Sequence, residues 1–242
     1  MSVTPIVKNL VRLSLLERVS PVLLVRFLRP YEGYLAARGL SLDGVTHDLA
    51  WVGALHHVMS VVDATTPGAL VQAFLDVAEL ASDEGHEAAL NLAGERQLNL
   101  FAGQRGASAE DLAFRLYLEH RDVFTSTQAR VQSQEARRFV DFHPEVHRPL
   151  LEPGSAAKRL MLQDQLSRWF AGRNRSDYVE VRQSESDEEI SFVIIHGQPP
   201  RSLSVITSPS RRDRMSLLPD KQDTVVFDKA TGRLSINAQY AA

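Results

Sequence analysis

The spacing of apolar residues divides the chain into a helical part and a strand-rich part. Near the start, apolar residues recur every three or four positions, as at Ile6, Leu10 and Val11, which is the spacing of one helix face. From Tyr178 onward the period falls to two: YVEVRQ alternates, and ISFVII is an apolar run typical of a strand buried on both faces. The pattern predicts an α+β fold with helices first and an antiparallel sheet second.

Turn and capping residues mark the expected helix boundaries in the first part. A capping residue followed by proline occurs at Ser20-Pro21 and again at Thr66-Pro67, as at many helix starts. Ser108 with Asp111 three residues later resembles a capping box, and Gly39 is a natural residue to follow a helix end. These signals predict about six or seven helices before residue 150.

The second part begins with a connector. HPEVHRPLLEPGS, from residue 143 to 155, holds three prolines and a glycine, so it predicts a loop rather than an element. We therefore divide the chain into a helical region, residues 1–150, and an α+β region with an antiparallel sheet, residues 151–242. AAKRLMLQDQLSRWF predicts a helix that leads into this sheet.

Three further stretches carry strand predictions. QARVQSQEARRFVDF is either one helix or a helix followed by an edge strand. TVVFDKATGRLSIN predicts a hairpin because a short loop containing Gly232 joins two β-rich runs. SLSVITSPSRRDRMSLLPDKQD, between the apolar strand and the hairpin, predicts one edge strand and a long exposed loop.

Composition narrows the class of protein. The chain of 242 residues has no cysteine, which excludes thiol catalysis, disulfides and cysteine-ligated metals. Charges interrupt the first apolar stretch, so no transmembrane segment is predicted, and we expect a cytoplasmic protein. There are 23 arginines but only four lysines, a bias typical of GC-rich bacterial genomes.

Charge is distributed unevenly along the chain, although the net charge is only −3. Residues 1–38 hold six basic and two acidic groups, whereas residues 39–129 hold four basic and thirteen acidic groups. Residues 130–172 carry a net charge of +2, and residues 173–242 carry none. Because acidic stretches repel phosphate, any nucleic-acid contact is expected near the ends of the chain.

HPEVH is the stretch that most resembles a metal site. A zinc-binding helix of the HExxH type places two histidines one turn apart with a glutamate at the second position. Here Glu145 stands at the third position, and Pro144 disfavours helical angles at His143. A turn bringing His143, Glu145 and His147 together with Asp141 stays open as a metal site, but a bend in the chain is favoured.

His196 is the best single candidate for a catalytic residue. It ends the apolar run and precedes Gly197 and a proline-rich loop, where functional side chains are common. A hydrogen-bonded structural histidine is the simpler interpretation. The chain has no GxGxxG, GxxxxGK[ST] or GxSxG motif, so standard dinucleotide, P-loop and serine-hydrolase sites are excluded, and no cofactor is predicted.

Arginines cluster in the last third of the chain. If their loops share one edge of the sheet, they form a rim that binds phosphate, with Trp169 or Tyr178 available to stack on a base. Ten acidic residues in the same segment favour ordinary solvated loops instead. The nucleic-acid candidates are Arg173, Arg175, Arg201, Arg211, Arg212 and Arg214.

These observations favour a non-catalytic bacterial subunit that acts through protein–protein contacts. The net charge of +4 on the first two helices suits a partner protein, and the acidic middle suits contact between copies in a homo-oligomer. Nucleic acid is a further candidate partner through the arginine-rich region. The alternative is a metal-assisted hydrolase that uses His196 and the segment from Asp141 to His147, so enzymatic activity is left open.

Overall fold

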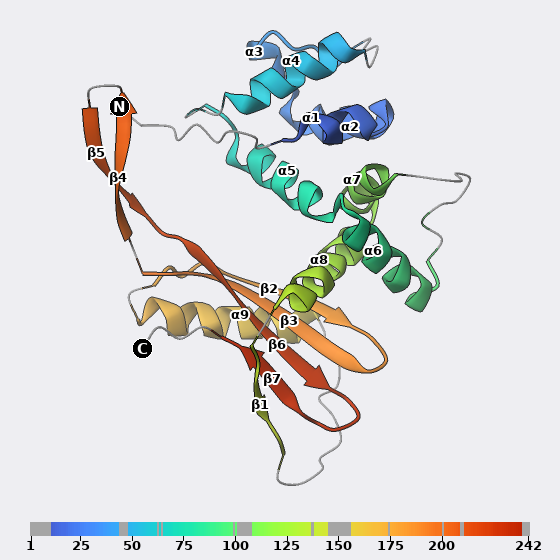
Figure 1. Cartoon of the computed structure of the whole chain (residues 1–242), viewed down its shortest axis with the longest axis vertical. Coiled ribbons are helices and arrows are strands. Elements are labelled where there is room, and N and C mark those ends of the chain that lie inside the picture. Colours follow the sequence, from blue (N-terminus) through green and yellow to red (C-terminus); the bar gives the residue numbers. More distant parts are fainter. Residues whose placement is uncertain are drawn as a thin grey trace. The chain divides into compact units, whose positions relative to one another are not determined.

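The computed structural model in Figure 1 has the predicted α+β class, with helices first and an antiparallel sheet second. Two compact units make up the chain, Met1–Thr127 and Gln128–Ala242. The division falls within a helix, whereas the sequence pattern placed the boundary after residue 150. The structure describes residues 11–43, 48–61, 63, 65–98, 100, 108–136, 138–144, 156–173, 175–199, 201–208 and 211–238, with the backbone alone for 201–217 and Glu135.

Aromatic side chains form the centre of the first unit. The Phe27 ring meets Phe74, Phe114 and Tyr117 edge to face, with centroids 4.8–5.3 Å apart, and such pairs stabilise a core beyond the area that they bury. No helix in the described residues is long and apolar enough to cross a bilayer. The helices up to residue 135 are α1 (Leu13–Arg18), α2 (Pro21–Leu28), the 3₁₀ turn η1 (Arg29–Tyr31), α3 (Glu32–Ala37), α4 (Leu49–Ser60), α5 (Gly68–Leu80), α6 (Asp83–Glu95), α7 (Ala109–Glu119) and α8 (Arg121–Glu135).

The N-cap residues seen in the structure agree in part with those predicted from the sequence. Ser108 caps α7 by accepting a hydrogen bond from the Asp111 backbone N–H at 3.1 Å, as predicted. The Asp111 carboxylate, however, accepts from the Ser20 backbone N–H at 2.5 Å, so the capping box is incomplete. The prediction for α5 was wrong by one position: Pro67 is the N-cap residue, and Thr66 instead accepts from the Asp63 backbone N–H at 3.0 Å.

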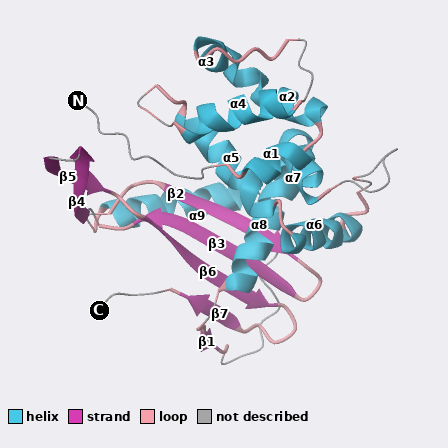
Figure 2. Ribbon diagram, turned by 45° about the horizontal axis from the view of Figure 1, so that its top comes forward, coloured by secondary structure: helices cyan, strands magenta, loops and turns pink. Residues whose placement is uncertain are grey.

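The second unit is a five-stranded antiparallel sheet with a helix on each face. Ala129 of α8 packs with Val193 and Ile195 on one face, and Phe170 of α9 packs with Val179 and Val181 on the other (Figure 2). The apolar run ISFVII is an inner strand, and TVVFDKATGRLSIN forms a hairpin, as predicted. In sheet order the strands are β1 (Val140–Phe142), β7 (Leu234–Asn237), β6 (Asp220–Asp228), β3 (Glu189–Gly197) and β2 (Val179–Glu185), with α9 at Ala156–Ala171.

The sequence left two interpretations for residues 128–142, and the structure shows the second. Helix α8 ends at Glu135, and β1 is an edge strand of the sheet that pairs only with β7. This edge strand carries the exposed side chains of Val140 and Phe142. The last residues of α8 belong to the second unit, because Ala129 packs against Val193 and Ile195 of the sheet.

Residues 201–217 form a pair of strands, so the prediction of a long exposed loop was wrong. Strand β4 (Arg201–Ser208) pairs with β5 (Arg211–Leu217) in a separate two-stranded sheet, which we call the arm. The arm extends the β3–β6 pair, because β4 follows β3 and β5 precedes β6 (Figure 1). Pairing with β4 satisfies the backbone polar groups on one edge of RRDRMSL, which lacks the alternation typical of a strand.

Proline separates the arm from the main sheet. The ladder of β3 and β6 ends where Gly197 faces Asp220, and the arm ladder begins where Arg201 faces Leu217. Pro219 lies between the two ladders and has no N–H to donate, although its carbonyl accepts from the Gln198 backbone N–H at 2.7 Å. The pairing therefore resumes with its register shifted by one residue.

Candidate functional site

Arg173, Arg175 and Arg201 lie at one end of the five-stranded sheet, and Arg211, Arg212 and Arg214 lie beyond that end, toward the tip of the arm. At that end of the sheet, helix α9 and strand β3 finish, and β2 and β6 begin. A Cβ atom added at Gly197 would lie 2.3 Å from the Ser176 Cβ, so the segment after α9 lies directly against the end of β3. Arg173 and Arg175, which follow α9, therefore lie close to the base of the arm. The arm itself contains the other four candidate arginines.

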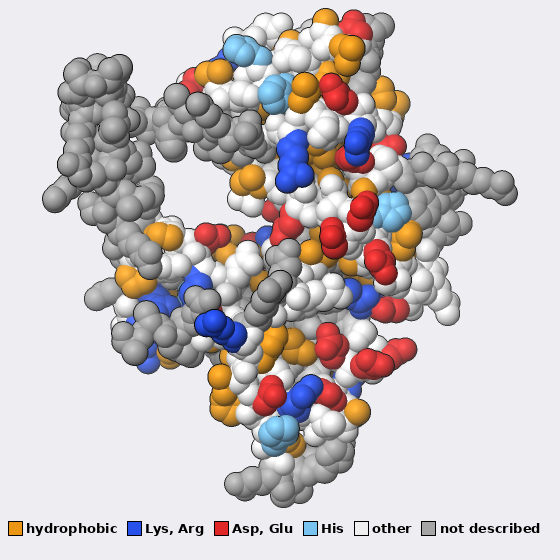
Figure 3. Space-filling view, viewed as in Figure 1, with side chains coloured by type: hydrophobic (Ala, Val, Ile, Leu, Met, Phe, Trp, Pro, Cys, Tyr) orange, Lys and Arg blue, Asp and Glu red, His pale blue; other side chains and the backbone are white. Residues whose placement is uncertain are grey.

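The charges at the two ends of this sheet differ in sign. We call residues 168–178 and 197–221 the basic end; they hold eight basic and three acidic residues. We call residues 185–189 and 228–233 the acidic end; they hold five acidic and two basic residues. In Figure 3 several of the described Lys and Arg side chains lie at the left end of the sheet.

Arg173 and the aromatic residues of α9 form a mixed cationic and aromatic surface. The Arg173 guanidinium carbon lies 3.8 Å from the Trp169 ring centroid, and Nη1 donates to the Trp169 carbonyl at 3.3 Å. The guanidinium of Arg175 lies 5.6 Å from the buried Phe170 ring. Both arginines follow the C-terminus of α9, where the helix dipole favours cations, so their positions also have a structural cause. Trp169 remains 42% exposed and Tyr178 58%.

The pairing register of the arm shows which face of the ribbon each arginine position occupies. Arg212 faces Ile206 and Arg214 faces Ser204, so these two arginines share one face of the ribbon, and Arg211 belongs to the other face. Residues 201–217 contain four arginines and one aspartate. The arm is therefore the most basic element of the second unit.

His196 is fully buried in a network at the basic end. Its Nε2 lies 2.9 Å from an Asp223 carboxylate oxygen, and its ring stacks on Phe170 with centroids 4.0 Å apart. The other Asp223 oxygen lies 2.8 Å from Lys221 Nζ. No reactant can reach a ring that Phe170 covers and that has no exposed surface, so this geometry favours the structural interpretation of His196.

Asp141 and His196 are not brought together. Asp141 lies opposite Ser235 on the sheet face that α8 covers, whereas His196 faces α9. His143 is exposed and lies outside any helix, while Glu145 and His147 lie outside the described residues. Among the residues with described side chains, no group of three or more His, Asp or Glu is arranged to hold a metal ion.

A largely apolar pocket of about 360 Å³ lies between α9 and the sheet. Leu166 and Trp169 of α9 form one wall, and Val225 and Ile236 form the other. Asp223 is the charged residue in the lining: Oδ2 lies 2.9 Å from His196 Nε2, and Oδ1 forms an ion pair with Lys221 at 2.8 Å although it accepts no hydrogen bond from a described residue. This pocket therefore offers an apolar surface next to the basic end but no charged group without a partner.

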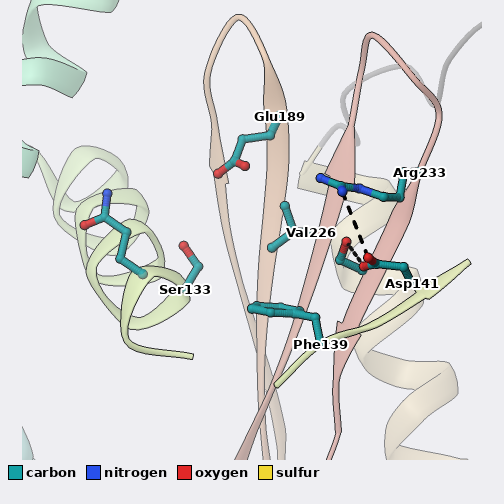
Figure 4. Close-up of a pocket in the computed structure, with 8 residues that line it drawn as sticks. Ser133, Phe139, Asp141, Glu189, Val226 and Arg233 are labelled. Atoms are coloured by element: carbon teal, nitrogen blue, oxygen red, sulfur yellow. Dashed lines mark hydrogen bonds and ion pairs between the residues drawn. The ribbon is translucent and has the colours of Figure 1, made fainter. Parts of the chain in front are cut away.

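A second, more polar pocket of about 380 Å³ lies on the opposite face of the sheet, and we call it the α8-side pocket (Figure 4). No sequence signal marked it, because its residues come from separated segments and meet only through strand register. It contains two carboxylates, one guanidinium and one aromatic ring. Its lining residues are Ser133, Gln134, Phe139, Asp141, Glu189, Val226, Arg233 and Ser235.

Comparison of the chain with protein-family models, curated protein sequences and solved structures finds no match in any of the three. A function for the chain is therefore inferred from its own geometry and charge.

Proposed function

We propose that this chain is a cytoplasmic bacterial binding subunit, and that its basic end contacts nucleic acid. The observation that supports this proposal is the collection of six arginines, distant in sequence, at and beyond one end of one sheet. Clustered guanidinium groups attract phosphates and release condensed counterions when they bind, which gives affinity without sequence recognition. The negative first unit does not oppose this contact if the nucleic acid meets the basic end alone.

The shape of the arm, like its charge, suits binding to a nucleic-acid duplex. A two-stranded antiparallel ribbon is narrow enough to enter the major groove, whose width is about 12 Å. Arg212 and Arg214 occupy alternate positions of strand β5, so the register places both on one face of the ribbon. Trp169 and Tyr178 at the base of the arm could stack on bases of an unpaired strand.

A metal-assisted hydrolase has less support than a binding protein. That alternative needs His196 and the segment beginning at Asp141 in one cleft, but Asp141 and His196 lie on opposite faces of the sheet. Partner-protein contacts stay part of the proposal, because the edge strand β1 exposes Val140 and Phe142.

The proposal is tested by measuring binding to labelled oligonucleotides by fluorescence anisotropy at several salt concentrations. The test variant changes Arg211, Arg212 and Arg214 to Ser, and the control variant changes the exposed Arg12, Arg18 and Arg26 of the first unit to Ser. We expect the arm variant to bind at least about tenfold more weakly and to lose about two to three units of the salt slope. We expect the control to bind like the unmodified protein. Equal weakening by both variants, or no binding by the unmodified protein, would contradict the proposal.

A further inference from the structure

The α8-side pocket holds a guanidinium whose hydrogen-bonding capacity is not filled. Arg233 Nε is buried and has no hydrogen-bond partner. Its terminal nitrogens lie 4.0 Å from an Asp141 oxygen and 3.7 Å from an Asp228 oxygen, both beyond the range of about 2.7–3.2 Å for a hydrogen bond. The terminal N–H groups, unlike Nε, belong to a side chain that is 43% exposed, so they can donate to a ligand with an oxygen acceptor. The guanidinium fork matches a carboxylate, which accepts two parallel hydrogen bonds.

Two carboxylates border the same cavity, and neutral hydroxyl groups hold them in place. An Asp141 oxygen accepts a hydrogen bond from the Ser235 hydroxyl at 2.6 Å, and a Glu189 oxygen accepts from the Ser191 hydroxyl at 3.2 Å. Figure 4 shows Arg233 extending across Val226 into the space that Asp141 and Glu189 border. The two carboxylates exceed the one guanidinium in charge, so the pocket favours a ligand that also carries a cation.

Apolar groups complete the lining. The Phe139 ring lies between α8 and the sheet, and Val226 lies beneath the guanidinium (Figure 4). These surfaces can bury the aliphatic or aromatic part of a small ligand. The cavity of about 380 Å³ is near the lower limit of the range of about 300–1,000 Å³ for small-molecule sites, which suits a ligand of few atoms.

We infer that the α8-side pocket binds a free α-amino acid, with the ligand carboxylate on Arg233 and the ligand ammonium between Asp141 and Glu189. A simple carboxylic acid would leave the two protein carboxylates without a cation. An amine without a carboxylate would leave the terminal nitrogens of Arg233 without a hydrogen-bond acceptor. The zwitterion satisfies both, and its side chain contacts Phe139 and Val226. This inference does not depend on nucleic-acid binding, because these residues differ from those of the basic end.

The test screens the twenty common L-amino acids against the full chain, first by thermal unfolding and then by calorimetry. We expect at least one of them to raise the unfolding midpoint by a few degrees at a ligand concentration well above its Kd. The best ligand is then compared with its deamino acid and its decarboxylated amine, and both analogues should bind at least about tenfold more weakly. The inference is overturned if no amino acid binds or if either analogue binds as well as the amino acid.

Substitutions of Arg233 test whether the ligand binds in the α8-side pocket. Arg233→Gln removes the guanidinium, and Arg233→Lys keeps the charge but loses the fork, so both should weaken the best ligand at least about tenfold. Arg12→Gln, an exposed arginine outside the pocket lining, is the matched control and should leave its affinity unchanged. If Arg233→Gln binds as tightly as the unmodified protein, the ligand lies elsewhere and the inference is wrong. If the Arg233 variants do not fold, the analogue comparison on the unmodified chain still decides the question.

Discussion

The two ends of the five-stranded sheet carry opposite charge and use their charged residues differently. At the acidic end, several charged groups build the turns: Lys229 Nζ lies 2.7 Å from a Glu185 oxygen and donates to the Ser186 carbonyl at 2.6 Å. Asp228 accepts hydrogen bonds from the backbone of Ala230 and Thr231. At the basic end, four of the arginines belong to the arm, outside the main sheet. The charged residues of the acidic end therefore have structural partners, whereas the arginines of the arm are proposed to bind nucleic acid.

Charge reversal in the arm is the change with the largest expected effect. Replacing Arg211, Arg212 and Arg214 with Glu turns phosphate attraction into repulsion, so nucleic-acid binding should fall by at least about a hundredfold. The same protein should keep the amino-acid affinity of the α8-side pocket, because that pocket lies at the other end of the sheet. Anisotropy and calorimetry on one preparation test both statements. Loss of both affinities would show that the two ends are not independent.

The buried network at the basic end should contribute strongly to stability. Asp223→Ala leaves the His196 ring and the Lys221 ammonium without their shared carboxylate, and we expect a loss of about 2–4 kcal/mol in the free energy of unfolding. Asp164→Ala is the matched control, since Asp164 forms an exposed pair with Arg168 on α9; it should cost less than about 0.5 kcal/mol. Urea unfolding at neutral pH measures both variants. Equal losses would mean that burial does not distinguish the two aspartates.

The ion pair at the acidic end should have a smaller effect. Lys229→Met removes the bonds to Glu185 and to the Ser186 carbonyl in a partly buried turn, so we expect a loss of about 1 kcal/mol. Lys158→Met, on the exposed start of α9, serves as the control and should change stability by less than about 0.5 kcal/mol. The measurement is again urea unfolding. A loss as large as that of Asp223→Ala would contradict the distinction drawn between the ends.

The smallest expected effect is on pH dependence at the turn between β6 and β7. Hydrogen bonds from the backbone and side chain of Thr231 lower the pKa of Asp228 below its ordinary value. Stabilisation by this carboxylate is therefore complete above the pKa of the unfolded chain, and it is lost as the pH falls through the lower pKa of the folded state. Thr231→Ala should raise the folded-state pKa of Asp228 toward its ordinary value, as measured by NMR titration. An unchanged pKa would show that the hydroxyl has no part in the shift.

Sequence patterns predicted the elements whose signal is local. The alternation in YVEVRQ, the apolar run of β3 and the loop before Gly232 each depend on adjacent residues, and the structure shows a strand or hairpin at each. One edge strand was predicted in the arm, but β5 was missed because RRDRMSL does not alternate and its pairing depends on β4, a distant segment of the chain.

The site residues were likewise predictable only where they depend on neighbouring residues in the sequence. His196 was selected from its place at a strand end, but its partners Asp223 and Lys221 come from β6, and only the strand register reveals them. The α8-side pocket was not predicted because Ser133 and Arg233 are a hundred positions apart and carry no shared motif. The arginine cluster was proposed from sequence, yet its collection at and beyond one end required the antiparallel order of β2, β3 and β6.

The proline-marked break between the main sheet and the arm has a consequence for how the chain can evolve. Hydrogen bonding in the β3–β6 ladder ends at Gly197 and Asp220, so it does not depend on the residues of the arm beyond Pro219. Insertions, deletions or replacements within the arm therefore leave the register of the core strands unchanged. Related chains are expected to keep the sheet while varying the arm in length and composition, so that a new binding specificity could arise without a new fold.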